Sequence, residues 1–379
     1  MRLEQPTAWL ISLFSMSLTD HLHRKSDSIR AFLDERLVDF SPAREKWDAA
    51  QSGGPLVDAD ASSSWNLIGG AIDLRIRMMI TPTSISVPPE ERQIAYGTTF
   101  PSVLSELEAI QNRHGGYLGQ LPPDEETHLL QVCYLLAMYD AFRRSSFASQ
   151  RDSPLYTLKP GAKWRAHLNR VSENDVAILQ TLVEPALELF TLAVGQRVSL
   201  GPVFADSHLV DGADGDLIVN GTLIEIKCEA PGFQSKAVRQ VIAYALLDST
   251  GEYELKKCSI YLARFGALFG WDLDQIIREV SQGRYGYELL RDEFHAWLVD
   301  QEEIRRRAQD VRAENYNRLT EGWRAMLDAQ NEFVGTDRMN EDARRLAVRR
   351  SNEARMEMWR IEVECGVSKP NRMWTPFQE

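Results

Sequence analysis

The sequence predicts an α/β fold, with a small sheet in the middle of the chain and helical regions on both sides. Apolar residues recur at three- and four-residue spacing over residues 100–112 and 124–145, as in amphipathic helices. Between residues 197 and 265 this period gives way to short runs of β-branched and aromatic residues, which are typical of strands. Within that part, Asn220-Gly221 indicates a two-residue hairpin turn, because both turn positions need a positive φ.

Residues 1–165 are predicted to form a mostly helical region. The apolar run 8–18 has no basic cluster before it and no small-residue cleavage site after it, which favours a core helix over a secretory signal. The helix over 124–145 follows two prolines, and Asp124 is its expected N-cap. The polar stretch 145–163 is expected to be a connecting loop.

Residues 166–280 are predicted to hold the sheet. Ser172 and Asp175 form a capping-box-like start to a helix that continues to about Gly195. A second helix, over residues 234–248, is expected between the third and fourth strands. The predicted order is therefore α-β-β-β-α-β, with the strands at residues 197–205, 216–219, 222–227 and 258–265.

Residues 281–379 are predicted to return to helix, with charge-rich segments from 301 to 364. Their arginines are interleaved with nearly equal numbers of acids, for example Glu341 four residues before Arg345. This pattern favours a salt-bridged helix face, or an arm that packs on a protein partner, over a surface that follows a nucleic-acid backbone. The last residues, 371–379, are expected to be a disordered tail.

The composition is that of a soluble globular protein, 44% hydrophobic and 26% charged. No window approaches the roughly eighteen apolar residues of a membrane span. The net charge of −12 argues against a protein that coats polyanions, although it is compatible with a locally basic groove. The widely spaced cysteines argue against a zinc ribbon or an iron–sulfur cluster and favour a reduced, cytoplasmic protein: Cys133, Cys228, Cys258 and Cys365.

The predicted hairpin carries an acidic face. The turn places Asp216 opposite Glu225. One step further along the same face it places Asp214 opposite Lys227, unless a bulge at Gly215 resets Asp214 alone. Because side chains alternate along a strand, these polar groups point to one side of the sheet. The apolar side chains of the hairpin point to the other: Leu217, Ile224 and Ile226.

Two carboxylates that face each other repel, and each raises the pKa of the other. A hard divalent cation relieves this repulsion, and Mg²⁺ is usually held by one or two carboxylates together with substrate phosphate oxygens. A neighbouring lysine can orient the attacking water or stabilise developing negative charge. The pattern therefore indicates metal-dependent phosphodiester hydrolysis. The alternative is an edge hairpin with a solvated acidic face.

Asp216, followed after a hairpin by Glu225-Ile226-Lys227, resembles the motif of the PD-(D/E)XK nuclease superfamily. The next helix carries Gln240 and Tyr244, which match the QxxxY motif of the RecB-like branch. The similarity covers roughly residues 175–273. It implies a restriction-endonuclease-like core, in which helices flank a four-stranded mixed sheet in the order given above, with N- and C-terminal helical regions added.

The resemblance also implies roles for individual residues. Asp216 and Glu225 are expected to bind Mg²⁺ or Mn²⁺ together with the Ile226 carbonyl, and Lys227 is the expected catalytic lysine. Gln240 and Tyr244 are expected to support this site and contact the substrate. Lys236 lies on the same helical stripe and could contact a phosphate.

Two features depart from the family pattern. The proline of the family name is absent, since Gly215 precedes Asp216. The upstream histidine ligand of the RecB-like branch has no counterpart, and Asp73 is the nearest candidate for a third metal ligand. Asp73 could equally be an acid paired with Arg75 or Arg77. Two further alternatives lie on the helix before the sheet: Glu184 and Glu188.

Nucleic acid is the expected partner, DNA in preference to RNA. Two other function classes stay open. One is a catalytically silent scaffold or nucleic-acid-binding subunit of a larger complex, against which the intact acids and lysine argue. The other is a helical interaction protein, against which the Gln240–Tyr244 pair argues. Phosphate contacts are expected from a basic cluster, Lys227, Lys236, Arg239 and Arg264, whereas His208 is expected at the surface.

Overall fold

The structure is a computed structural model, which describes residues 18–24, 26–58, 64–80, 99–115, 119, 121–144, 155, 164–228, 230–334 and 341–365. It divides into two compact units, Met1–Ala296 and Trp297–Glu379, which are treated separately below. The regions 1–165 and 166–280, expected as separate parts, belong to the same compact unit. Three expected features lie wholly or almost wholly outside the described residues: the helix 8–18, the loop 145–163 and the tail 371–379.

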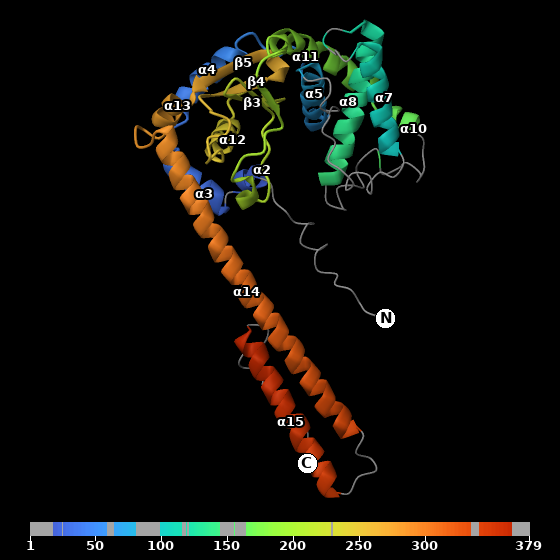
Figure 1. Cartoon of the computed structure of the whole chain (residues 1–379), viewed down its shortest axis with the longest axis vertical. Helices are drawn as coiled ribbons and strands as arrows, with labels where there is room; N and C mark the ends of the chain where they lie inside the picture. Colours follow the sequence, from blue (N-terminus) through green and yellow to red (C-terminus); the bar gives the residue numbers. More distant parts are fainter. Residues whose placement is uncertain are drawn as a thin grey trace. The chain divides into compact units, whose positions relative to one another are not determined.

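The first unit is a mixed α/β structure built on a five-stranded sheet with the strand order β1-β2-β3-β4-β5 (Figure 1). Strands β3 and β4 are parallel and all other neighbours are antiparallel. Helix α12 (Ser235–Leu246) makes the crossover that a parallel pair requires. The strands are β1 (Val198–Leu200), β2 (Leu217–Val219), β3 (Thr222–Lys227), β4 (Lys257–Leu262) and β5 (Ala267–Asp272).

The prediction of four strands was wrong, because β5 adds a fifth at the edge of the sheet. The predicted last strand ran through residue 265, but β4 ends at Leu262 and a short 3₁₀ turn follows. Gly266 ends that turn with φ of 59° and reverses the chain. A Cβ at this position would lie 3.0 Å from Pro185, so a side chain would be strained by close contact as well as by conformation.

The predicted hairpin register is confirmed. Asn220 and Gly221 have φ of 48° and 73°, as the two-residue turn requires. The ladder pairs Leu217 with Ile224 and continues to the turn. The predicted pairing of Asp214 with Lys227 is wrong, because Asp214 pairs with Val203 instead. Before β2 the chain follows the segment after β1, and the Gly215 amide donates to the Pro202 carbonyl at 3.0 Å.

Three helices cover the face of the sheet that carries Leu217, Ile224 and Ile226. They are α5 (Trp65–Ile80), α8 (Pro123–Arg144) and α11 (Glu173–Thr191). The predicted cap of α11 is confirmed, since the Ser172 hydroxyl accepts from the Asp175 amide at 3.0 Å. Asp124 is not an N-cap, because α8 already begins at Pro123 and Asp124 lies in its first turn. Helices α7 (Thr99–Arg113) and α10 (Trp164–Leu168) pack on α8.

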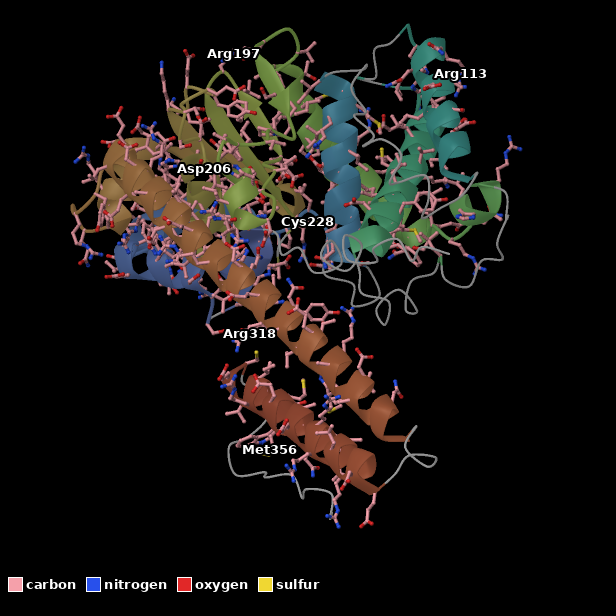
Figure 2. The ribbon with its side chains drawn as sticks, turned by 60° about the horizontal axis from the view of Figure 1, so that its bottom comes forward. Arg113, Arg197, Asp206, Cys228, Arg318 and Met356 are labelled. Carbon is pink, nitrogen blue, oxygen red and sulfur yellow. The ribbon has the colours of Figure 1, made fainter. Side chains whose placement is uncertain are left out.

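Two glycines let α5 approach both of its neighbours closely. A Cβ at Gly70 would lie 3.2 Å from Ala137 of α8, and one at Gly69 would lie 3.3 Å from Cys228. Cys228 directly follows β3 and is labelled in Figure 2. Larger residues would therefore push α5 away from the end of β3. This close packing brings the polar residues of α5 to the sheet.

The opposite face of the sheet packs against α12, which buries Val238, Val241 and Ile242. Helix α2 (Leu18–His23) packs on α12, and α4 (Ser41–Gln51) packs on β5. Around them lie α3 (Ser28–Arg36), α13 (Leu273–Val280) and the start of α14 (Tyr287–Val334). The start of α14 is tied to this unit by His295, whose Nδ1 lies 2.8 Å from Asp206 Oδ2.

The second unit comprises the rest of α14 and α15 (Glu341–Glu364), so the predicted charged helices are confirmed. The two helices pack antiparallel, with Arg318 paired to Glu364, and Gly322 close to Met358. Ion pairs within each helix have three- or four-residue spacing, and they include the predicted pair of Glu341 with Arg345. None of the described helices has the length and apolar character to cross a membrane.

Candidate functional site

The two strands of the predicted hairpin separate at the end away from the turn. Asp216 lies at this open end. The ladder between β2 and β3 stops after Leu217 and Ile224. In a continued ladder the next amide of β3 would donate to a backbone carbonyl of the neighbouring strand. Here the Ile226 amide donates to Asp216 Oδ2 at 2.7 Å. The Asp216 carboxylate thus replaces the backbone carbonyl that would accept this hydrogen bond in a continued ladder. The bond to the backbone of β3 fixes its position.

Glu225 points from β3 into the same place and is almost completely buried, with 3% of its surface exposed. Its Oε1 accepts from Lys227 Nζ at 2.9 Å, whereas its buried Oε2 has no hydrogen-bond partner in the part of the chain that the structure describes. Burial raises the pKa of Glu225 to about 8, and the negative charge of Asp216 adds to the effect while Lys227 opposes it.

The structure brings Gln240 and Tyr244 to this site through Lys227. Besides its bond to Glu225, the Lys227 amine donates to Gln240 Oε1 at 2.9 Å. The Gln240 amide nitrogen donates to the Tyr244 hydroxyl at 3.1 Å, across one turn of α12. Gln240 and Tyr244 are both buried. Burial, together with the charge of Glu225, raises the pKa of Tyr244, so its hydroxyl stays protonated at neutral pH.

Asp73 reaches the site from α5, where its predicted pairing with Arg77 is confirmed, whereas its role as a metal ligand stays a prediction. It is paired with Arg77, whose Nε donates to Asp73 Oδ1 at 2.8 Å. It is also close enough to Asp216 for the charge of Asp216 to raise its pKa. Burial is the main cause of the shift, which takes the pKa of Asp73 to about 7 against the opposing effect of Arg77. Arg75 is bound elsewhere, to Glu126.

The Arg77 guanidinium lies between the two acids, 3.8 Å from Asp216 Oδ1. A glycine makes room for it: a Cβ at Gly201 would lie 2.8 Å from Arg77 Nη1. The cluster therefore holds three carboxylates, Asp73, Asp216 and Glu225, against two cations, Arg77 and Lys227. At low dielectric this excess of negative charge favours either the uptake of a proton or the binding of a cation.

The residues at the opening fit a hard divalent cation. Within the described residues, no group of three or more His, Cys, Asp or Glu side chains is arranged to hold a metal. Mg²⁺ needs fewer protein ligands than that, because it keeps several waters and uses substrate phosphates. Asp216 and the unpartnered Glu225 Oε2 supply two oxygen donors of the right kind. The Ile226 carbonyl and Asp73 stay predicted ligands.

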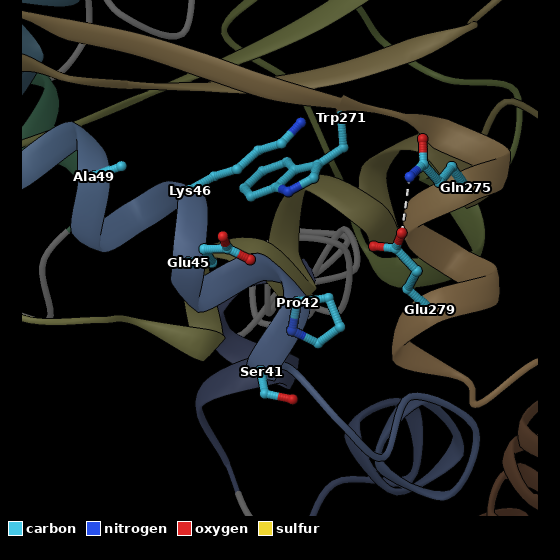
Figure 3. A pocket seen from close by; sticks show the side chains of 8 residues that line it. All are labelled: Ser41, Pro42, Glu45, Lys46, Ala49, Trp271, Gln275 and Glu279. Carbon is cyan, nitrogen blue, oxygen red and sulfur yellow. Dashed lines mark hydrogen bonds between the residues drawn. The ribbon is translucent and has the colours of Figure 1, made fainter.

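Several predicted residues lie away from the site. Glu184 and Glu188 are exposed on α11, which covers the opposite face of the sheet. His208 is exposed, as predicted, with its Nδ1 3.0 Å from the Ala205 carbonyl. A cavity between α4, β5 and α13 contains none of the candidate residues (Figure 3). Its lining residues are Ser41, Pro42, Glu45, Lys46, Ala49, Trp271, Gln275 and Glu279.

The predicted basic cluster was wrong for two of its four members. Arg239 is buried, paired with Asp34 at 2.6 Å and placed over the Phe40 ring. Arg264 is buried over Trp65, with its guanidinium 4.1 Å from the ring centre. A planar guanidinium stacks on aromatic rings and can be buried in this way. Lys236 is exposed on α12, and Lys227 lies within the site.

No sequence pattern indicated Thr19 at the site, and Arg77 was indicated only as a possible partner of Asp73. Thr19 of α2 accepts a hydrogen bond from Gln240 Nε2 at 2.9 Å. No local pattern links residues that are 221 positions apart, so the sequence contains no signal for this contact. Arg77 had a weak signal in its four-residue spacing from Asp73, which predicts the salt bridge but not the approach to Asp216.

The stability of the metal-free protein is expected to fall as the pH rises from about 5 to about 8.5. The pKa values of Glu225 and Asp73 are raised to about 8 and about 7, above their unfolded values. In that window the folded state holds more protons than the unfolded chain, so the free energy of unfolding decreases with pH. The measurement is urea unfolding in EDTA at several pH values.

Glu225→Gln should flatten this pH dependence and raise the stability at pH 8.5, because the buried charge is absent. Glu184→Gln is the matched control, since Glu184 is exposed on α11. A pH dependence that is the same in Glu225→Gln and in the wild type would contradict the burial of an ionisable Glu225.

The comparisons with known proteins give no relative. No family model matches the chain, no curated protein matches it, and no solved structure matches it. The functional interpretation therefore depends on the residues of the site and on their geometry.

Proposed function

We propose that the chain is a metal-dependent nuclease of the PD-(D/E)XK superfamily, in its RecB-like branch, that hydrolyses phosphodiester bonds of DNA. The observation that carries the proposal is one connected cluster, in which Lys227 bonds to both Glu225 and Gln240 beside Asp216. Five residues with assigned roles in the motif come together from β3, the segment before β2 and α12.

The order of elements also supports the proposal. Helix α11, strands β1 to β3, helix α12 and strand β4 follow one another as the restriction-endonuclease-like core requires. Strand β5 is an addition at the sheet edge, beside β4. The site lies at the end of β3, on the side of that strand that faces β2. Strand β5 is separated from β3 by β4, so its addition does not change the arrangement of the proposed ligands.

Asp216 and Glu225 are the proposed metal ligands, with the Ile226 carbonyl and Asp73 completing the set. A divalent cation at these oxygens supplies Lewis-acid polarisation of the scissile phosphate. Lys227 is held at the carboxylates by two hydrogen bonds, where its ammonium group can orient the attacking water and stabilise negative charge on the phosphate. Gln240 holds this amine from the α12 side, with Tyr244 behind it.

The affinity for DNA is expected to depend weakly on salt. Each phosphate contact contributes about −0.9 to the slope of log K against log salt on duplex DNA. Lys227 and Arg77 lie in the site and Lys236 is exposed on α12, so the expected slope is about −2 to −3. Fluorescence anisotropy in EDTA measures binding without cleavage.

Lys236→Gln should make that slope less negative by about 1, whereas Arg239→Gln should leave it unchanged. Arg239 is the control because it is buried against Asp34. Affinity independent of salt would contradict phosphate contacts at this site.

A catalytically silent scaffold of the same fold is the alternative, and Arg77 is the observation that favours it. Its guanidinium neutralises Asp73 and approaches Asp216, so part of the negative charge that would attract a metal is already balanced. In that case the site would bind nucleic acid or a partner subunit without cutting. Cleavage measurements separate the two proposals.

The test is incubation of the purified protein with single-stranded DNA, duplex DNA and RNA of the same sequence. Each substrate is treated with Mg²⁺, with Mn²⁺ and with EDTA. The nuclease proposal expects cleavage of DNA with either metal and none in EDTA. A protein that binds DNA but cuts no substrate with either metal would favour the scaffold.

A further inference from the structure

Helix α2 packs next to the site and is held there by several contacts. The Leu18 amide donates to the Gly212 carbonyl at 3.0 Å, in the loop that leads to Asp216. His21 Nδ1 lies 2.8 Å from Asp27 Oδ2, and the helix packs on α12. Leu18 and Leu22 are buried. These contacts fix the position of Thr19, which lies between the two buried leucines and faces α12.

The Thr19 hydroxyl belongs to a small closed network with Gln240 and Tyr244. It accepts from Gln240 Nε2 at 2.9 Å and lies 3.3 Å from the Tyr244 hydroxyl. The same Gln240 nitrogen donates to the Tyr244 hydroxyl. A carboxamide nitrogen has two hydrogens, and both are therefore used on this side.

The Lys227 amine determines which end of the Gln240 side chain faces it, because an ammonium group can only donate. With the nitrogen directed to two hydroxyl groups, Oε1 is directed to the Lys227 amine at 2.9 Å. A flipped amide would place its own N–H donors against the ammonium group, which has no acceptor. The two hydroxyls can donate as well as accept, so they do not choose the orientation but hold the amide in place. Loss of the Thr19 hydroxyl would remove one of these two restraints.

We propose that Thr19 is a positioning residue that restrains the Gln240 carboxamide and thereby holds the Lys227 amine beside Glu225. Its effect on cleavage rests on the proposed nuclease function, whereas its effect on Gln240 does not. Helix α2 thus completes the site from a part of the chain that precedes the motif by about two hundred residues.

The test compares Thr19→Val, which keeps the shape and removes the hydroxyl, with Thr19→Ser, which keeps the hydroxyl. The first readout is solvent exchange of the Gln240 side-chain amide hydrogens, followed by NMR in metal-free protein labelled at glutamine nitrogen. The signal is assigned by its loss in Gln240→Leu. Exchange should be about two- to tenfold faster in Thr19→Val, as expected for one lost hydrogen bond, and unchanged in Thr19→Ser.

The second readout is kinetic. Thr19→Val should lower kcat about two- to tenfold with KM and Mn²⁺ affinity unchanged, and Thr19→Ser should restore the rate. If Thr19→Val does not fold, Thr19→Ala replaces it. Wild-type amide exchange in Thr19→Val would overturn the proposal, as would a change in KM or metal affinity without a change in kcat. If the wild type cuts nothing, the nuclease function fails, and amide exchange alone decides the role of Thr19.

Discussion

Lys227→Ala is expected to lose nearly all DNA cleavage while leaving the affinity for Mn²⁺ close to that of the wild type. The variant removes the only amine that bonds to both Glu225 and Gln240 among the described residues. The carboxylate donors remain, and Glu225 loses a competing positive partner. Removal of a group that stabilises transition-state charge costs on the order of 10²- to 10³-fold in rate. The measurement is the single-turnover cleavage rate beside a Mn²⁺ titration.

The matched control is Lys236→Ala. This residue is an exposed lysine on α12, and its loss should affect binding to DNA rather than the rate of the chemical step. Cleavage by Lys227→Ala at the wild-type rate would place the chemistry at a different site. A large loss of Mn²⁺ affinity in this variant would indicate that Lys227 has a structural role instead.

Asp216→Asn is expected to lose both metal affinity and cleavage. The asparagine can still accept from the Ile226 amide through its side-chain oxygen, so the opening of the hairpin should keep its shape. The charge that would bind the cation is absent. We expect Mn²⁺ affinity to fall by at least about tenfold, or ~1.4 kcal/mol, with cleavage undetectable at metal concentrations that saturate the wild type.

The metal-free Asp216→Asn protein should also be at least as stable as the wild type. Burial and the charge of Asp214 raise the pKa of Asp216, whereas Lys227, Arg77 and the Ile226 amide lower it. The substitution therefore removes a buried negative charge from a cluster of acids that includes Asp214. Glu188→Gln, an exposed change on α11, is the control. Unchanged Mn²⁺ affinity in Asp216→Asn would show that the ligands lie elsewhere.

The parts of the site that were predictable are those fixed by local geometry. The Asn220-Gly221 turn determines the hairpin register, and the register determines which face carries Glu225 and Lys227. The four-residue spacing of Gln240 and Tyr244 places them on one side of α12. The prediction for Asp214 was wrong because the chain before β2 pairs with the segment after β1, a choice that the turn does not control.

The parts that were missed depend on packing between distant segments. Thr19 reaches Gln240 because α2 packs on α12, and Arg77 passes close to Gly201 as it approaches Asp216. Arg239 and Arg264 were assigned to a basic groove, yet both are buried against aromatic rings. The presence of an arginine or a lysine in a sequence does not indicate whether the side chain will be buried. Strand β5 was missed because a short turn separates it from β4.

We propose that the open end of the β2–β3 hairpin cuts DNA with the help of a divalent cation. The most direct measurement is the Mg²⁺-dependent cleavage of one labelled DNA by wild type, Lys227→Ala and Glu184→Gln, purified in the same way. Wild type and Glu184→Gln should cut at equal rates, and Lys227→Ala should cut about 10²- to 10³-fold more slowly. Equal cleavage by all three proteins, or no cleavage by any of them, would contradict the claim.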